Sequence, residues 1–130
     1  KAVWEKIKSY SDIKFELYNG VAKITINRPK VYNAFRPETN IQMLEAIDVC
    51  RERNDIDIVV FTGEGEKAFC SGGDQNVKGS GGYIGKDGVP RLNVLDLHKK
   101  IREITFIKLG VNLFQNQYRE NQSLSHKKNK

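Results

Sequence analysis

Alternating hydrophobic and polar residues mark the first structural elements of the chain. Residues 13–18 (IKFELY) alternate as a half-buried strand does, and residues 21–27 (VAKITIN) have the pattern of a return strand. Asn19-Gly20 lies between them, a pair that strongly favours a two-residue hairpin turn. Arg28-Pro29 ends the second strand, because proline has no N–H to donate to a sheet. The pattern therefore predicts a β-hairpin.

The period then changes from that of a strand to that of a helix. Pro37 suits the first turn of a helix. Up to about Arg53, apolar residues recur at helical spacing, namely Ile41, Leu44, Ile47 and Val49-Cys50. Residues 56–62 (IDIVVFT) are apolar and β-branched after Asp57, which is typical of a strand covered on both faces. A hairpin, a helix and a buried strand in this order predict an α/β domain with a helical crossover.

The rest of the chain is less regular. Residues 63–88 are rich in glycine and poor in large aliphatic side chains, and a loop this long is usually functional or disordered. A second helix is predicted to open at Pro90, with a stripe formed by Leu95, His98, Ile101 and Arg102. The alternation over 107–113 is compatible with another strand. The Gln, Asn, Ser and Lys residues of 115–130 predict a disordered tail, because they bury too little apolar surface.

Charge and hydropathy exclude several classes of protein. The chain has 130 residues and a net charge of +6, and residues 101–130, with six Lys or Arg and two Asp or Glu, carry most of that charge. The folded part is therefore not expected to bind nucleic acid. No apolar run approaches the roughly 20 residues of a membrane helix, so membrane insertion is not expected. The first residues lack the apolar region of a signal peptide.

The two cysteines, Cys50 and Cys70, are too few for a disulfide framework. No Cys/His spacing fits a zinc site, so no metal is expected. A reducing, cytoplasmic location fits this composition. We interpret Cys70 as a small buried packing residue and not a nucleophile, because no histidine lies near it in the sequence. Trp4 and Tyr10 are interpreted as packing anchors, and His98 as a solvated or interface residue of a helix and not as a base.

The most informative segment is residues 68–75 (AFCSGGDQ). Glycines directly after a buried strand let the backbone approach a ligand closely. Their N–H groups can then point at an anion or at a polarised carbonyl oxygen. The alternative is a tight turn that needs positive φ angles. The segment lacks the Gly-Lys-Ser/Thr of a phosphate-binding P-loop, and Gly63-Glu64-Gly65 lacks the third glycine of a dinucleotide fingerprint.

This segment resembles the first oxyanion-hole loop of the crotonase (enoyl-CoA hydratase/isomerase) superfamily. Asn27-Arg28-Pro29 followed by Asn33-Ala34-Phe35 resembles the acyl-CoA loop of the same superfamily. Residues 69–75, with Gly81-Gly82-Tyr83 and residues 92–96 (LNVLD), are similar to its 1,4-dihydroxy-2-naphthoyl-CoA synthase branch. The resemblance runs from about Trp4 to Ile104. It implies the crotonase-like ββα fold, an α/β class, of which this chain holds the N-terminal half.

The resemblance also implies a reaction. That branch converts o-succinylbenzoyl-CoA to the naphthoyl product of menaquinone biosynthesis by an intramolecular Claisen condensation, a lyase reaction. The backbone N–H of Gly73 is the implied first oxyanion donor, and Tyr83 matches an active-site tyrosine that assists proton transfer. Ser71, Gly72, Gly73, Asp74, Gln75 and Tyr83 are implied to line the site for the CoA thioester.

Tyr32 belongs to the same implied CoA site, but it stands where the family usually has an arginine that meets a CoA phosphate. Tyrosine can hydrogen-bond a phosphate, but it supplies no charge. Arg28, Lys30 and Arg36 are candidates to replace that charge. Asp74 is either an acid or, as we favour, a residue that orders backbone N–H groups.

The implied cofactors and partners follow from the same resemblance. The CoA thioester is a substrate, no cofactor is tightly bound, and bicarbonate serves some full-length members. A homo-oligomer is expected, since the family forms hexamers. Nucleic acid and membrane are not expected partners.

Residues 105–130 do not resemble the family. We therefore divide the chain into a crotonase-like portion, 1–104, and a divergent basic tail, 105–130. The second oxyanion donor and the base site have no match here, as in a frameshifted or remnant gene product. Ring closure by the chain alone is therefore not expected. Two alternatives stay open: a non-catalytic remnant that binds CoA or oligomerises, and a basic-tailed binding module unrelated to acyl-CoA.

Overall fold

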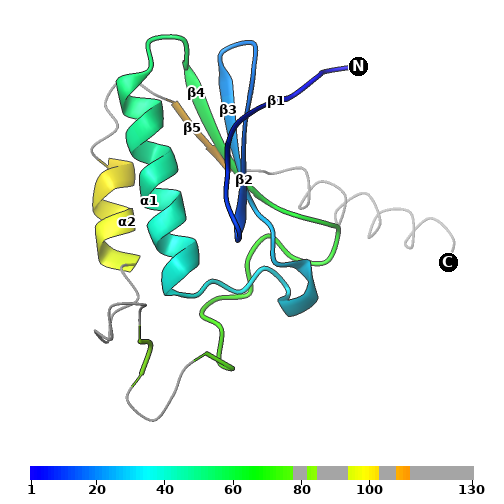
Figure 1. Ribbon diagram of the computed structural model, residues 1–130, viewed down its shortest axis with the longest axis vertical. Helices are drawn as coiled ribbons and strands as arrows, with labels where there is room; N and C mark the ends of the chain where they lie inside the picture. The colour runs from blue at the N-terminus through cyan, green and yellow to red at the C-terminus, as the bar shows by residue number, and fades with distance from the viewer. Residues whose placement is uncertain (78–81, 85–93, 103–107, 112–130) are drawn as a thin grey trace, which may run out of the picture.

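In the described part of the chain, a five-stranded mixed sheet and two α-helices form the fold (Figure 1). The computed structural model describes residues 1–77, 82–84 and 94–102, together with the backbone of 108–111. The strands lie in the sheet in chain order, and this arrangement confirms the α/β class. The strands are β1 (Glu5–Ser9), β2 (Ile13–Tyr18), β3 (Val21–Ile26), β4 (Ile58–Gly63) and β5 (Lys108–Val111), and the helices are α1 (Pro37–Glu52) and α2 (Val94–Arg102).

The predicted hairpin is confirmed. β2 and β3 pair antiparallel from Ile13 opposite Ile26 to Tyr18 opposite Val21. Asn19 and Gly20 both have positive φ angles, 48° and 79°, as a type I′ turn requires. The edge strand β1 was not predicted, because the sequence EKIKS has a single apolar residue, and its pairing with β2 is interrupted by a register shift.

The helical crossover is also confirmed. β3 and β4 pair in parallel, from Val21 beside Ile58 to Ile26 beside Gly63. A parallel pair needs a crossover connection, and α1 provides it. β5 continues the parallel half of the sheet beside β4, so the alternation noted over 107–113 does mark a strand.

The core lies between α1 and one face of the sheet, with α2 beside α1 (Figure 1). The predicted face of α1 was partly wrong, because Ile41 is 44% exposed and Leu44 is only partly buried, whereas Thr39, Asn40 and Gln42 are buried. The side chains that are fully buried in this core come from both layers: Phe15, Ala22, Ile24, Ala46, Ile47, Cys50 and Val59.

Two further expectations need correction. β4 alternates between buried and half-buried residues and is not fully covered on both faces. On α2 the buried positions are Leu97 and, partly, Ile101, which are four residues apart on one helix face. Leu95, placed in the predicted stripe, is 82% exposed. The predicted helix start at Pro90 and the predicted disorder of 115–130 lie outside the described residues.

The corrected face of α1 can be tested by two matched truncations on the same helix. Ile47→Ala removes a fully buried side chain, so we expect a loss of about 2–5 kcal/mol in the free energy of unfolding. Ile41→Ala removes a side chain that is 44% exposed, and we expect a loss below about 1 kcal/mol. Urea unfolding followed by circular dichroism measures both. Equal losses would contradict the described orientation of the helix.

Candidate active site

Two loops meet beyond the carboxyl ends of β3 and β4. The first loop, residues 27–36, follows β3, and the second loop, residues 64–77, follows β4. Because β3 and β4 are parallel neighbours, both loops leave the same edge of the sheet. In open α/β sheets, ligands bind outside this edge. The first loop contains a short 3₁₀ turn, η1 (Pro29–Val31).

The side chain of Asn33 joins the first loop to the second by hydrogen bonds. It is 1% exposed, and its backbone has a φ angle of 56°, which asparagine adopts more readily than most residues. Its Oδ1 accepts a hydrogen bond from the Arg28 N–H at 3.0 Å. Its Nδ2 donates to the carbonyl oxygens of Glu64, at 2.9 Å, and Ala68, at 2.7 Å. One amide group thus satisfies three backbone groups from both loops.

A short parallel β-bridge between Phe35 and Gly73 joins the loops a second time. The Phe35 N–H donates to the Gly72 oxygen at 2.9 Å, and the Asp74 N–H donates to the Phe35 oxygen at 2.8 Å. Both bonds use the neighbours of Gly73, so the N–H and C=O of Gly73 itself point to the opposite side. No hydrogen bond among the described residues uses the Gly73 N–H. Within the described part of the chain, the bridge therefore leaves this donor without an acceptor.

Tyr83 lies directly against Gly73. A Cβ atom added at Gly73 would clash with the Tyr83 hydroxyl group. Gln75 joins the pair, since its Nε2 donates to the Gly73 oxygen at 3.2 Å and to Tyr83 Oη at 3.4 Å. The structure therefore brings together three residues that the sequence singled out. A larger residue at position 73 would displace the tyrosine.

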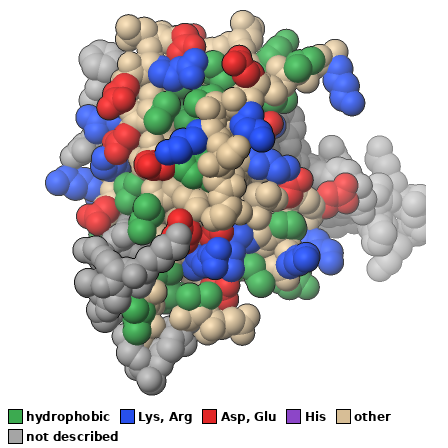
Figure 2. Space-filling model, viewed as in Figure 1, with side chains coloured by type: hydrophobic (Ala, Val, Ile, Leu, Met, Phe, Trp, Pro, Cys, Tyr) green, Lys and Arg blue, Asp and Glu red, His purple; other side chains and the backbone are tan. Residues whose placement is uncertain are grey.

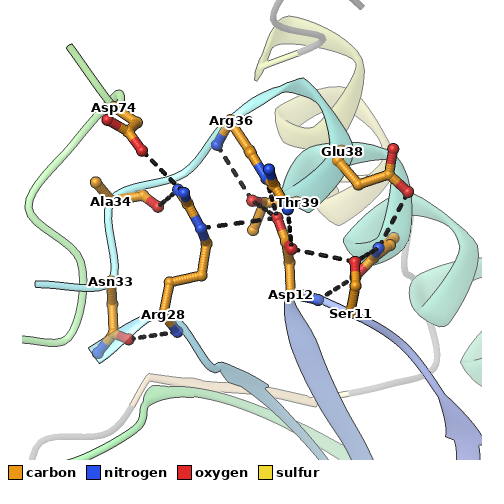
Figure 3. Close-up of polar contacts among 10 residues, drawn as sticks. Ser11, Asp12, Arg28, Asn33, Ala34, Arg36, Glu38, Thr39 and Asp74 are labelled. Atoms are coloured by element: carbon orange, nitrogen blue, oxygen red, sulfur yellow. Dashed lines mark hydrogen bonds and ion pairs between the residues drawn. The ribbon is translucent and has the colours of Figure 1, made fainter. Parts of the chain in front are cut away.

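The carboxylate of Asp74 points into the protein and binds Arg28 (Figure 3). Its side chain is 4% exposed, Oδ2 lies 2.9 Å from Arg28 Nη2, and Oδ1 accepts from the Asn76 N–H at 3.0 Å. The other terminal nitrogen of Arg28 donates to the Ala34 oxygen. This placement supports the structural alternative for Asp74, which orders the second loop.

Arg28 also faces Asp12, which immediately precedes β2 (Figure 3). Asp12 is 2% exposed and accepts two hydrogen bonds from Arg36, at 2.8 and 2.7 Å, and one from the Thr39 hydroxyl at 2.7 Å. Burial by itself raises the pKa of Asp12, but the hydrogen bonds from Arg36 and Thr39 outweigh it and lower the pKa from 3.8 to about 2. We call the set Asp12, Arg28, Arg36 and Asp74 the ionic ladder.

The ionic ladder changes which residues can supply the phosphate-binding charge that is missing at Tyr32. Arg28 and Arg36 were candidates for a phosphate-binding charge, but both guanidinium groups are paired with carboxylates of the ladder. Sequence reasoning did not find Asp12, because a polar residue before a strand gives no signal of its distant partner.

Tyr32 and Lys30 instead line a groove of about 300 Å³ between the two loops. The tyrosine is 55% exposed, and Lys67, a lining residue that the sequence did not indicate, has its Nζ 5.9 Å from the centre of the ring. Ser71 is exposed beside the groove, and its hydroxyl donates to the Val31 oxygen at 3.4 Å. Lys30 therefore remains as a candidate cation, and Lys67 joins it.

Elsewhere on the surface, charges of both signs are interspersed on the face seen in Figure 2. Several lysines are paired with glutamates, as in Lys8–Glu45 and Lys14–Glu64. Among the described residues, no group of His, Cys, Asp or Glu is arranged to hold a metal. The described helices include none with the length and apolar character needed to cross a membrane.

The cysteines and the expected packing residues are placed as follows. Cys50 is fully buried on α1, and burial raises the pKa of its thiol to about 12. Cys70 packs against the core as predicted, but it is half-buried and not buried. Trp4 packs against Tyr18, with their ring centres 5.6 Å apart. Tyr10 packs at the edge of the core, and His98 is exposed on α2. Gly81 lies outside the described residues.

The sequence and the structure were compared with known proteins. Residues 16–110 match the enoyl-CoA hydratase/isomerase family. This match covers more than half of the chain, and the chain belongs to that family. The match extends past Ile104, where the resemblance stated from the sequence motifs ends, and it includes the first three residues of β5.

Solved structures agree with this assignment. An enoyl-CoA hydratase/isomerase from Xanthobacter autotrophicus Py2 is 36% identical over 54% of this chain and 26% of its own, with a TM-score of 0.52. A carnitinyl-CoA hydratase from Mycobacterium avium is 30% identical over 53% of this chain and 26% of its own, with a TM-score of 0.51. A further family member, at 22% identity and a TM-score of 0.60, shares the fold. The matched parts span about a quarter of the length of the first two proteins.

The pKa of Asp12 leads to a prediction for acid unfolding. A carboxyl group whose pKa is lower in the folded state stabilises that state above its unfolded pKa, and this stability is lost as the pH falls through the folded pKa. Between about pH 5 and pH 2, we expect Asp12 to account for a loss of about 2 kcal/mol. Asp12→Asn should therefore show a shallower pH dependence of unfolding in urea. An unchanged slope would contradict the described pairing.

Proposed function

We propose that this site binds a CoA thioester and stabilises the enolate form of its carbonyl oxygen through the backbone N–H of Gly73. The observation that carries the proposal is the Phe35–Gly73 bridge, which turns that N–H away from the first loop and leaves it without an acceptor among the described residues. The family assignment supports the choice of a CoA thioester as the ligand.

The chemistry explains why a backbone donor is useful here. When a proton leaves the carbon next to a thioester carbonyl, negative charge develops on the thioester oxygen. An N–H fixed by the bridge is already oriented toward that charge, so little reorganisation is needed as the charge forms. The hydroxyl of Tyr83 lies against Gly73 and can exchange a proton with the reacting substrate. The Gln75 Nε2 contacts this hydroxyl at 3.4 Å.

The groove beside the site is proposed to take the nucleotide end of CoA. Tyr32 offers an exposed aromatic face, and Lys30 and Lys67 are the cations of a groove that Glu64 and Glu66 also line. Glu64 is paired with Lys14, outside the groove lining. Ser71 and Gly72 connect this groove to Gly73 along the second loop. These residues supply both ring stacking and charge, a combination suited to an adenine nucleotide.

As the specific reaction in which this site supplies the first oxyanion donor, we propose ring closure of o-succinylbenzoyl-CoA to 1,4-dihydroxy-2-naphthoyl-CoA by intramolecular Claisen condensation. The support is the similarity of residues 69–75 and of Tyr83 to that branch of the superfamily. The enolate required by a Claisen condensation is the species that Gly73 would stabilise. A homo-oligomer and a cytoplasmic location belong to the same proposal.

Enolate stabilisation can be measured without turnover. Acetoacetyl-CoA forms an enolate with its own ultraviolet absorbance, so its ionisation can be followed when it is bound to the protein. We expect bound acetoacetyl-CoA to ionise at lower pH than the free thioester. Gly73→Ala should weaken enolate binding about tenfold or more, because the added methyl group displaces Tyr83 and narrows access to the donor. Unchanged binding in the variant would refute the role of Gly73.

The role of Tyr83 has a matched control on the sheet. Tyr83→Phe removes only the hydroxyl group beside Gly73, and Tyr18→Phe removes a hydroxyl group from a side chain that is 42% exposed on β2. We expect the first change to lower any rate of o-succinylbenzoyl-CoA conversion by about 10²–10⁴, with little effect on affinity. The second should leave both unchanged. Equal and measurable rates for Tyr83→Phe and the unmodified chain would exclude the tyrosine from proton transfer.

A further inference from the structure

Arg28 contacts both sides of the bridge that carries Gly73 (Figure 3). One terminal nitrogen donates to the oxygen of Ala34, the residue before Phe35. The other binds the carboxylate of Asp74, the residue after Gly73, at 2.9 Å. The guanidinium group therefore spans the bridge from the first loop to the second, beside its two backbone hydrogen bonds.

Arg28 is itself held in position from the opposite direction. Its Nε lies 3.8 Å from Asp12, whose carboxylate is fixed by Arg36 and by the Thr39 hydroxyl at the start of α1. The Arg28 side chain is 15% exposed, and those of Asp12 and Asp74 are 3% and 4% exposed. A planar group with donors in fixed directions and little water around it has few alternative positions.

We propose that Arg28 is a positioning residue, which sets the register of Phe35 against Gly73 and thereby the direction of the Gly73 N–H. Only the expected effect of Arg28 on CoA-thioester binding rests on the proposed function. The register itself can be measured on the protein without any ligand. Neither the family assignment nor the motif at Gly73 gives Arg28 this role.

A positioning role must be distinguished from simple charge balance. If Arg28 only neutralised buried carboxylates, its loss could be compensated by removing the charge of Asp74, and the affinity for a CoA thioester would return. If it sets the register, its geometry is needed as well as its charge. Lysine keeps the positive charge, but its single ammonium group cannot reproduce the fork that meets Ala34 and Asp74 together.

The experiment compares four variants of the full chain: Arg28→Lys, Arg28→Met, Asp74→Asn and the double variant Arg28→Met/Asp74→Asn. The register is read from hydrogen exchange of the Asp74 N–H, which donates to the Phe35 oxygen across the bridge. Amides of the β2–β3 hairpin serve as internal standards. Affinity for acetoacetyl-CoA is measured by calorimetry, and stability by the urea midpoint.

We expect Arg28→Lys to speed exchange of this N–H at least tenfold, and to weaken acetoacetyl-CoA binding by a similar factor, while hairpin amides keep their rates. Arg28→Met should lower the urea midpoint, because it leaves the Asp74 carboxylate buried without its cation. The double variant should recover the midpoint without recovering the affinity. Arg53→Lys is the matched control, since Arg53 binds Asp55 in an exposed pair away from the bridge.

Three results would overturn the proposal. The first is an exchange rate of the Asp74 N–H in Arg28→Lys that equals the rate in the unmodified chain. The second is recovery of affinity together with stability in the double variant, which would reduce Arg28 to charge balance. The third is an equal effect from Arg53→Lys. If the unmodified chain binds no CoA thioester, the proposed function fails, and the exchange measurement still decides the role of Arg28.

Discussion

The site depends on one constraint: two loops without regular secondary structure must meet, and their inward-facing backbone groups must still find hydrogen-bond partners. A buried carbonyl without a donor costs about 1–3 kcal/mol. Asn33 removes this cost for Glu64 and Ala68, and Arg28 removes it for Ala34. Gly63 permits the approach, because a Cβ there would lie 2.6 Å from the Ala68 oxygen and 2.7 Å from Asn33 Nδ2.

The same arrangement determines what the loops can offer a ligand. Hydrogen bonds to Gly72 and Asp74 complete the bridge to Phe35, and geometry then directs the intervening N–H of Gly73 outward. Asp74, the acidic side chain nearest this donor in the sequence, is turned inward to Arg28. An anion at Gly73 therefore does not have to approach that carboxylate directly. The ionic ladder joins the two loops, and it also turns the Asp74 carboxylate away from the Gly73 N–H.

Much of the fold followed from local sequence patterns, and the misses share a cause. Asn19-Gly20, the helical period after Pro37 and the apolar strand before Gly63 each act over short distances, so each could be predicted. The polar residues at the start of α1 could not be assigned to the interior by hydrophobicity. Thr39 and Gln42 are buried because they bind Asp12 and Ser11, which lie about thirty residues earlier. The site motif predicted the meeting of Gly73 with Tyr83, but nothing local linked Arg28 to Asp74.

Stability alone gives a weak reason for the ionic ladder. Removing charged groups from water costs several kcal/mol for each ion, and well-packed apolar residues often stabilise a buried position as well or better. Apolar side chains, however, pack in several registers and give no fixed direction to a neighbouring N–H. The ladder fixes direction, because the guanidinium groups of Arg28 and Arg36 donate only to acceptors that lie in line with their N–H bonds. The presence of the ladder between the two loops is therefore better explained by the precision of the site than by the stability of the fold.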